Sequence, residues 1–184
     1  MSFYIEGQPN GIPSDLFTSL ESGIRRIRVD VAQTGFWEGR EFRFDYEVSE
    51  PIVFKFSSPV NFILQSQELF SHDGESTLTV WSPTQGTPSG SFSTPAQILP
   101  NNGMSETPAY TRQVAINSGG TFAPTDTNPN LAREYIKVKA ATSTAQRNTV
   151  GGSGVNERGL PAGDYYLLFT GTDASYRLVF EERP

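Results

Sequence analysis

The sequence predicts an all-β protein: an antiparallel β-sandwich of jelly-roll-like type, preceded by an irregular N-terminal arm. Apolar residues recur with a period of two, as in EFRFDYEV at residues 41–48, which is typical of a strand with one buried and one wet face. The chain also contains 17 Gly and 13 Pro, which favours many turns over long helices. Its 184 residues suit one folded domain. We place that domain at residues 24–184 and the arm at residues 1–23.

The arm lacks the period of a strand. PSDLFTSLESG, at residues 13–23, has the signals of two helical turns, with Ser14 as N-cap and Gly23 just past the end. A segment of this kind cannot offset its ordering entropy alone, so we expect its apolar residues to contact a partner. These candidate interface residues are Phe3, Tyr4, Ile5, Leu16, Phe17 and Leu20.

Period-two segments then follow one another along the chain. Strands are expected at IRRIRVDV (24–31), EFRFDYEV (41–48), IVFKF (52–56), NFILQSQELF (61–70), STLTVW (76–81), TRQVAIN (111–117), EYIKVKA (134–140), DYYLLFTG (164–171) and SYRLVFEE (175–182). In EYIKVKA a helical pairing of Leu131, Tyr135 and Val138 competes with the strand pattern. The strand is favoured, because the lysines alternate cleanly with Ile136 and Val138.

Turn signals suggest how some of these strands connect. Asp73-Gly74 predicts a hairpin between the strands at 61–70 and 76–81. LPAG, at residues 160–163, suits a β-turn that leads into DYYLLFTG. Both faces of that segment are apolar, so we expect a central strand that is covered on each side, and a core hairpin with SYRLVFEE. In the loop before it, Glu157 and Arg158 are expected to pair.

The segments at 82–111 and 117–133 are expected to be loops, with 82–102 one long loop, and loops of this length are often functional. Their large apolar side chains fit either anchors of a satellite core, which we favour, or subunit contacts. These candidate interface residues are Phe92, Met104, Tyr110 and Phe122. Trp37 and Trp81 are the natural aromatic platforms for a ligand, but the high average burial of Trp favours core caps for both.

Composition argues against several classes of partner. The net charge is −6, and the only basic cluster is Arg25, Arg26 and Arg28, which alternates with apolar residues as on the wet face of a strand. We therefore expect no nucleic-acid binding. No apolar run is long enough to span a bilayer, and the first residues lack a signal-peptide pattern, so folding in the host cytoplasm is the default expectation. Cysteine is absent, which removes thiol chemistry and disulfides.

Candidate catalytic and metal-binding groups are few, and we expect neither enzymatic activity nor a cofactor. His72 is the single histidine, and its place beside a turn favours an exposed residue over a general base. DTNPN, at residues 126–130, resembles the first half of a calcium loop but lacks the following Gly and Glu, so Asx turns explain it more simply. The carboxylates of alternating strands are expected on solvated faces.

Three segments carry a family resemblance. KFSSPVNFIL (55–64), GGSGVNERGLPAGDYYL (151–167) and SYRLVFEER (175–183) together resemble a group of small virion-associated proteins that tailed bacteriophages encode. The similarity runs from about residue 35 to the C-terminus, and the motifs are more specific in combination than singly. No catalytic residue is implied, because the shared motifs are of a structural kind.

The resemblance implies a non-enzymatic structural component of a phage particle. We expect a capsid decoration or cement protein that docks on neighbouring virion subunits, such as the major capsid protein or neck and tail subunits, and that forms a homo-oligomer such as a trimer. The alternative is a tail- or neck-associated accessory protein, or a module that binds a receptor or carbohydrate. Both alternatives use β-folds, so the fold alone does not separate them.

Overall fold

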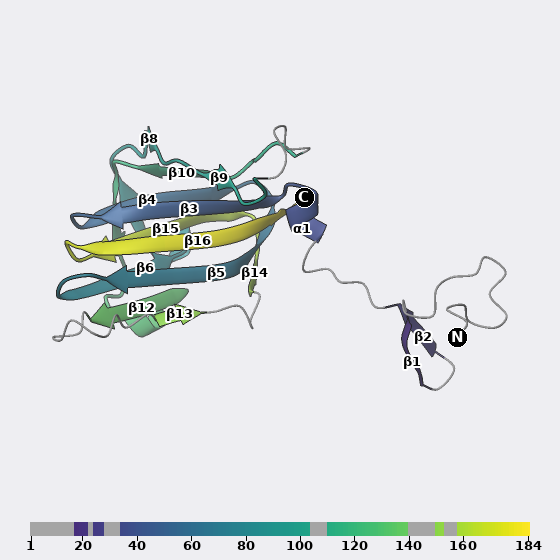
Figure 1. The fold of residues 1–184 in the computed structure, drawn as a ribbon. Helices are drawn as coiled ribbons and strands as arrows, with labels where there is room; N and C mark the ends of the chain where they lie inside the picture. Colours follow the sequence, from purple (N-terminus) through teal and green to yellow (C-terminus); the bar gives the residue numbers. More distant parts are fainter. Residues whose placement is uncertain (1–16, 22–23, 28–33, 104–109, 140–149, 153–157) are drawn as a thin grey trace. The chain divides into compact units, whose positions relative to one another are not determined.

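The computed structural model describes residues 17–21, 24–27, 34–103, 110–139, 150–152 and 158–184 (Figure 1). The chain forms two compact units, residues 1–34 and 35–184. In the first unit β1 (Phe17–Glu21) and β2 (Ile24–Ile27) pair antiparallel.

The helical turns expected at 13–23 are therefore wrong for residues 17–21, since pairing with β2 overrides a weak helix propensity. The same pairing joins segments on both sides of Gly23, and the first unit extends to Thr34 instead of ending there. The strand expected at 24–31 is observed as far as Ile27, and residues 28–31 lie outside the described part.

The second unit is built on two antiparallel sheets (Figure 1). The first has the order β12 (Glu134–Lys139), β6 (Glu75–Trp81), β15 (Gly163–Thr170), β4 (Ile52–Ser58), β10 (Ala115–Ser118), β8 (Thr94–Pro95). The second has the order β13 (Val150–Gly152), β5 (Asn61–Ser71), β16 (Ala174–Arg183), β3 (Glu41–Val48), β9 (Leu99–Pro100), with β14 (Arg158–Leu160) also on β5. The all-β prediction is confirmed.

The two sheets contain eight main strand positions, one of them shared by β13 and β14, and these are connected as in a jelly roll. β3 pairs with β16, β4 with β15, β5 with β13 and β14, and β6 with β12. These pairs describe one long antiparallel ribbon whose tip is the connection from β6 to β12. Wrapping the ribbon places β16 beside β5 and β15 beside β6, which completes the two sheets.

This wrapping means that successive strands usually belong to opposite sheets. β5 and β6 are in different sheets, so the hairpin predicted at Asp73-Gly74 is wrong. The core hairpin predicted for β15 and β16 is wrong for the same reason. Gly74 has a φ of 68° and does make a tight turn, but that turn crosses from sheet to sheet. A turn signal specifies local backbone geometry and leaves open which sheet receives the next strand.

Aromatic side chains from the two sheets interlock in the core. Phe44 of β3 meets Phe54 of β4 edge-on, with ring centroids 5.3 Å apart. Phe180 of β16 lies 5.3 Å from Phe56 of β4. The alternation seen in EFRFDYEV therefore corresponds to an inward row, because Phe42, Phe44 and Val48 are all buried. Such edge-to-face pairs add to the stabilisation from buried apolar area.

β15 is central in its sheet and apolar on both faces, as predicted. Its outer face is covered by a ribbon of β7 (Gly86–Ser89) and β11 (Thr121–Pro124). Phe122 of that ribbon stacks on Tyr166 at 4.4 Å. Trp81 completes this second cluster. The expectation of one long loop at 82–102 is thus wrong in part, because short strands made of Pro, Gly, Ser and Thr lack the apolar period that reveals longer strands.

The strand assignment at 134–140 is confirmed for residues 134–139, with Ile136 and Val138 buried and the lysines exposed. The described helices are single turns: α1 (Thr34–Trp37), η3 (Pro83–Gln85) and η4 (Pro129–Leu131). Among the described residues, none of the helices has the length and apolar character that crossing a membrane requires.

Candidate functional site

The predicted interface residues fall into two groups in the structure. Phe17 and Leu20 belong to β1, of which only the strand itself is described. Phe3, Tyr4, Ile5, Leu16 and Met104 lie outside the described residues. Their predicted contacts therefore stay predictions.

The other three are packed within the jelly roll. Phe122 is 6 % exposed and has no free surface to offer a partner. Phe92 lies 5.6 Å from Tyr166, in the same cluster. Tyr110 packs against the main core beside Phe42, and its hydroxyl accepts a hydrogen bond from Gln113. These positions favour the anchor role over the contact role, and Tyr110 is not gathered with the other two.

The two tryptophans have opposite environments. Trp81 is 3 % exposed, so the core-cap prediction is confirmed for it. Trp37 is 61 % exposed, so the same prediction is wrong there. Trp37 ends the single turn α1, where Phe36 turns partly inward and meets the indole edge-on at 5.2 Å. A one-turn helix can bury only one side, and that side is taken by Gly35 and Phe36.

His72 is exposed beside its turn, as predicted, and it has two polar neighbours in sequence-distant strands. Its Nε2 lies 2.6 Å from Oγ of Ser175, and that hydroxyl donates to Glu47 at 2.8 Å. With the hydroxyl proton directed at Glu47, the imidazole donates its own Nε2–H to Ser175. A general base must instead accept the nucleophile's proton, with the carboxylate behind the imidazole. The hydrogen bonds of this trio therefore run in the opposite direction to those that activate a serine nucleophile.

The residues of DTNPN cap their own loop. Asp126 accepts from the backbone N–H of Asn128 at 2.8 Å, and Asn128 accepts from that of Asn130 at 3.1 Å. The Asx-turn interpretation is confirmed. Within the described part of the chain, no group of three or more potential metal ligands comes together.

Three carboxylates are buried where solvated faces were predicted. Glu41 is 6 % exposed, Glu181 1 % and Glu182 0 %, so that prediction is wrong for these residues. Glu182 follows Phe180 in the inward row of β16 and accepts from the backbone N–H groups of Gln113 at 3.0 Å and Val114 at 2.8 Å. Glu182 therefore accepts the hydrogen bonds of two backbone donors at the start of the segment that leads into β10.

Glu181 points to the other face, under α1. Burial raises the pKa of its carboxyl above the ordinary value, although Arg183 and Arg40 act in the opposite direction. Arg183 lies 3.0 Å from one carboxylate oxygen, and Gln65 donates to that same oxygen at 3.2 Å. A side chain at Gly35 would overlap this carboxylate, which explains the glycine.

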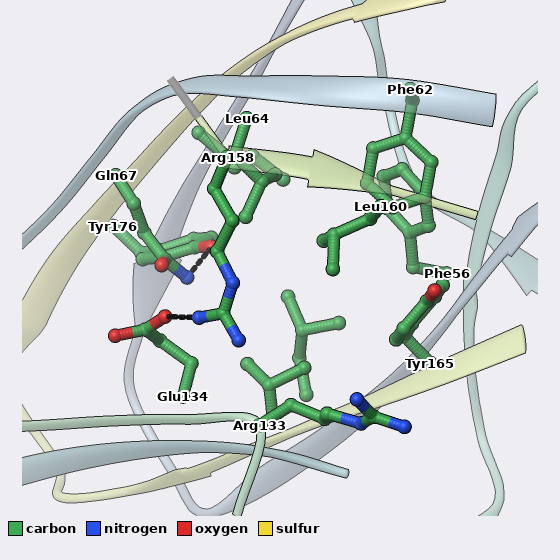
Figure 2. Close-up of a pocket in the computed structure, with 13 residues that line it drawn as sticks. Phe56, Phe62, Leu64, Gln67, Arg133, Glu134, Arg158, Leu160, Tyr165 and Tyr176 are labelled. Atoms are coloured by element: carbon green, nitrogen blue, oxygen red, sulfur yellow. Dashed lines mark hydrogen bonds and ion pairs between the residues drawn. The ribbon is translucent and has the colours of Figure 1, made fainter. Parts of the chain in front are cut away.

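A pocket lies between the sheets, bounded by β5 and β14 on one side and by β6 and β12 on the other (Figure 2). Its volume is about 30 Å³. Apart from the polar side chains at its edge, the walls are apolar and are formed by Phe56, Phe62, Leu64, Val80, Leu160, Tyr165, Leu167, Tyr176 and Leu178. The hydroxyl of Tyr176 is held by Gln67 at 2.8 Å. Because these groups come from six strands, sequence spacing gave no sign of the pocket.

Charged side chains surround the mouth of this pocket. Figure 2 shows Arg158 on one wall meeting Glu134 on the other, at 2.6 Å. Arg158 thus has Glu134 as its partner across the sheets, whereas the predicted partner, Glu157, lies outside the described residues. Arg133, next to Glu134, has no ion pair or side-chain hydrogen bond with any residue that the structure describes. The positive charges of Arg133 and Arg158 lower the pKa of the Tyr165 hydroxyl, but burial has the larger effect and raises this pKa above its ordinary value.

A second, open groove of about 400 Å³ lies on the outer face of the first sheet, beside the β7–β11 ribbon. Lys55 and Asp164 form an ion pair of 2.9 Å there, and hydrogen bonding to Asp164 raises the pKa of Lys55. Ser57 donates to the same carboxylate. Asn117 and Phe92 complete a mixed polar and aromatic lining.

No protein-family model matches this chain, no curated protein matches it, and no solved structure matches it. The resemblance to phage virion proteins therefore stays a hypothesis.

Proposed function

We propose that this chain is a non-enzymatic structural component of a tailed-phage virion, a capsid decoration or cement protein that docks on neighbouring subunits. The observation that carries the proposal is the exposed indole of Trp37. A tryptophan with most of its surface in water is unusual in a folded domain, and tryptophan is among the residues that contribute most to protein interfaces.

The surroundings of Trp37 suit docking. Asn102 donates to the backbone carbonyl of Phe36 at 3.0 Å, which ties α1 to the segment after β9. Leu99 of β9, 38 % exposed, adds apolar surface at this end of the jelly roll. An aromatic anchor that is held by a hydrogen-bonded frame loses little conformational freedom on binding, which favours affinity.

The division of the chain supports the same role. Residues 1–34 form a unit of their own, and the jelly roll begins at Gly35. We propose that the first unit adds contacts to neighbouring virion subunits, which are capsid or neck and tail proteins or further copies of this chain. The jelly roll is an architecture that viral capsid proteins share with lectins, so it agrees with the proposal without deciding it.

The second candidate is a tail- or neck-associated module that binds a receptor or carbohydrate. The groove beside the β7–β11 ribbon favours it, because Lys55, Asp164 and Asn117 offer donors and acceptors next to the ring of Phe92. A shallow cleft with polar groups and an aromatic side is the arrangement that such a module needs.

The test is Trp37→Ala in the full chain, with Tyr135→Ala as the matched control. Tyr135 is an aromatic residue on β12 with 37 % of its surface exposed. Purified particles assembled with wild-type protein should contain it in a fixed copy number. We expect Trp37→Ala to keep its melting temperature and to lose most of its incorporation, while the control incorporates normally. Normal incorporation of Trp37→Ala, or absence of the wild-type protein from particles, would contradict the proposal.

A further inference from the structure

The open groove beside the β7–β11 ribbon is lined by side chains that strand register brings together. Asn117 of β10 and Tyr166 of β15 are the two cross-strand partners of Lys55 of β4, so the three form one row on the outer face of the sheet. Ser57 and Asp164 are paired two residues further along and belong to the next row. Neighbouring strands lie about 4.8 Å apart in a sheet, which holds such rows at a fixed spacing. The polar groups of the groove are therefore preorganised.

Asp164 holds two of these polar groups in place. Nζ of Lys55 lies 2.9 Å from one carboxylate oxygen, and the hydroxyl of Ser57 donates to the other at 2.8 Å. Because the hydroxyl proton is directed at Asp164, the Ser57 oxygen is left as an acceptor. The Lys55 ammonium keeps further N–H donors, and the Asn117 amide both donates and accepts. The groove thus offers donors and acceptors to the same ligand.

The charges of the groove cancel. Among the described residues, Lys55 is the only charged side chain that lines it, and the ion pair with Asp164 neutralises that charge. An anion therefore gains no net attraction here, and the net charge of −6 on the whole chain disfavours it further. This balance favours a neutral ligand.

Phe92 gives the groove an apolar side. Its ring lies 5.6 Å from that of Tyr166, and a side chain at Gly120 would overlap it. The ring is therefore fixed by packing, while Phe92 as a whole is only half-buried. An aromatic ring held in this way offers its exposed part to the C–H groups of a ligand at little cost in conformational freedom.

Size and chemistry together narrow the class of ligand. The volume of about 400 Å³ falls within the range of small-molecule sites, about 300–1,000 Å³. Mixed donors and acceptors suit hydroxyl groups, since each hydroxyl both donates and accepts. A sugar ring carries hydroxyl groups around its edge and C–H groups on its faces, and it has no charge.

We propose that this groove binds a neutral pyranose sugar, with its hydroxyl groups on Lys55, Ser57 and Asn117 and a C–H face on the ring of Phe92. Asp164 is a positioning residue that orients Lys55 and Ser57 and cancels the charge. The inference rests on the second candidate function, to which it adds the class of ligand, and none of the residues near Trp37 takes part in it.

The experiment titrates the methyl α-glycosides of glucose, galactose and mannose into the full chain and follows backbone amide signals of β4, β10 and β15 by NMR. Cyclohexanol, which lacks most of the hydroxyl groups, and the methyl α-glycoside of glucuronate, which adds a negative charge, are the reference ligands. We expect one or more of the three sugars to bind with a Kd on the order of 1 mM and at least about threefold more tightly than either reference. Absence of binding by all three sugars, or equal binding of cyclohexanol, would overturn the proposal.

Asp164→Asn gives the most specific test, because it should reverse the selectivity. Without the carboxylate, Lys55 and Ser57 lose their anchor and the groove gains a positive charge. Binding of the neutral sugar should weaken about threefold or more, while binding of the glucuronate glycoside should strengthen. Asp73→Asn is the matched control, since Asp73 is an exposed carboxylate outside the groove, and it should change neither. Weaker binding of both ligands to Asp164→Asn would indicate a structural disturbance and refute this assignment.

Two variants test the groups that contact the sugar. Asn117→Ala should weaken binding of the neutral sugar several-fold, because it removes a donor and an acceptor from the groove. Phe92→Leu keeps an apolar side chain beside Tyr166 but removes the aromatic ring, and it should also weaken binding several-fold at an unchanged melting temperature. Wild-type affinity in both variants would place the sugar elsewhere and contradict the proposal.

The sugar site and the docking role fail separately. Trp37→Ala should bind the sugar as the wild-type protein does, and Asp164→Asn should enter particles in the normal copy number. Loss of sugar binding in Trp37→Ala would count against a site confined to the groove, whereas a failed incorporation test would leave the sugar titration unaffected.

Discussion

Glu182 provides the sharpest test of how the jelly roll is held together. Its side chain is fully buried at the inner face of β16, and its carboxylate accepts from the backbone N–H groups of Gln113 and Val114. Glu182→Ala leaves the buried N–H of Val114 without a partner, at a cost of about 1–3 kcal/mol, and the partly buried N–H of Gln113 without one at a smaller cost. The variant should therefore lose about 3 kcal/mol of unfolding free energy, which corresponds to a fall in melting temperature of about 6–12 °C for a chain of this size.

Glu182→Gln separates the hydrogen bonds from the charge. The amide oxygen still accepts from the backbone, but the amide nitrogen now faces an N–H donor, so a loss of about 1–2 kcal/mol is expected. Glu47→Gln is the control, because Glu47 is an exposed carboxylate and its one hydrogen-bond donor among the described residues is Ser175. Urea denaturation followed by tryptophan fluorescence and circular dichroism measures all three variants. A loss below about 1 kcal/mol for Glu182→Ala would refute the claim that this carboxylate anchors the strand leading to β10.

Two further predictions concern carboxyl and imidazole groups. Burial raises the pKa of Glu181 in the folded chain, so the folded chain binds a proton there more tightly than the unfolded chain does. The contribution of Glu181 to stability therefore falls as the pH rises from the ordinary pKa of Glu through the raised one. Glu181→Gln should consequently be more stable than wild type near neutral pH and similar to it near about pH 4. Melting temperatures measured across this range test this, and a constant difference between the two proteins would contradict the stated cause. His72→Ala should change the free energy of unfolding by no more than about 0.5 kcal/mol, since His72 is exposed and, among the described residues, its ring bonds to Ser175 alone. A larger loss in chemical denaturation would show that the trio with Glu47 stabilises the fold.

The sequence by itself determined which segments are strands and which of their faces are apolar. The two-residue period of EFRFDYEV follows from the pleat of a strand, so it reports the inward row of β3 without knowledge of its neighbours. The apolar character of both faces of β15 likewise predicted a central strand with cover on each side. The Asx turns at Asp126 and Asn128 could also be predicted from the sequence, because their side-chain oxygens accept from backbone N–H groups only two residues away.

Only the tertiary structure decided how the strands are wound. In a jelly roll the ribbon partner of β3 is β16, at the other end of the domain, and the next strand along the chain lies in the opposite sheet. Turn residues such as Gly74 fix a local backbone conformation and are compatible with either outcome. The predicted hairpins failed for this reason.

The candidate sites depend on the same long-range winding. Arg158 and Glu134 meet because β14 and β12 begin on facing walls of one pocket. Glu182 is buried because β16 ends beside the segment that leads into β10. A charged residue has the same local pattern whether it faces water or a distant backbone donor. Its environment is set by contacts between residues far apart in the chain, and those contacts exist only once the ribbon has wrapped.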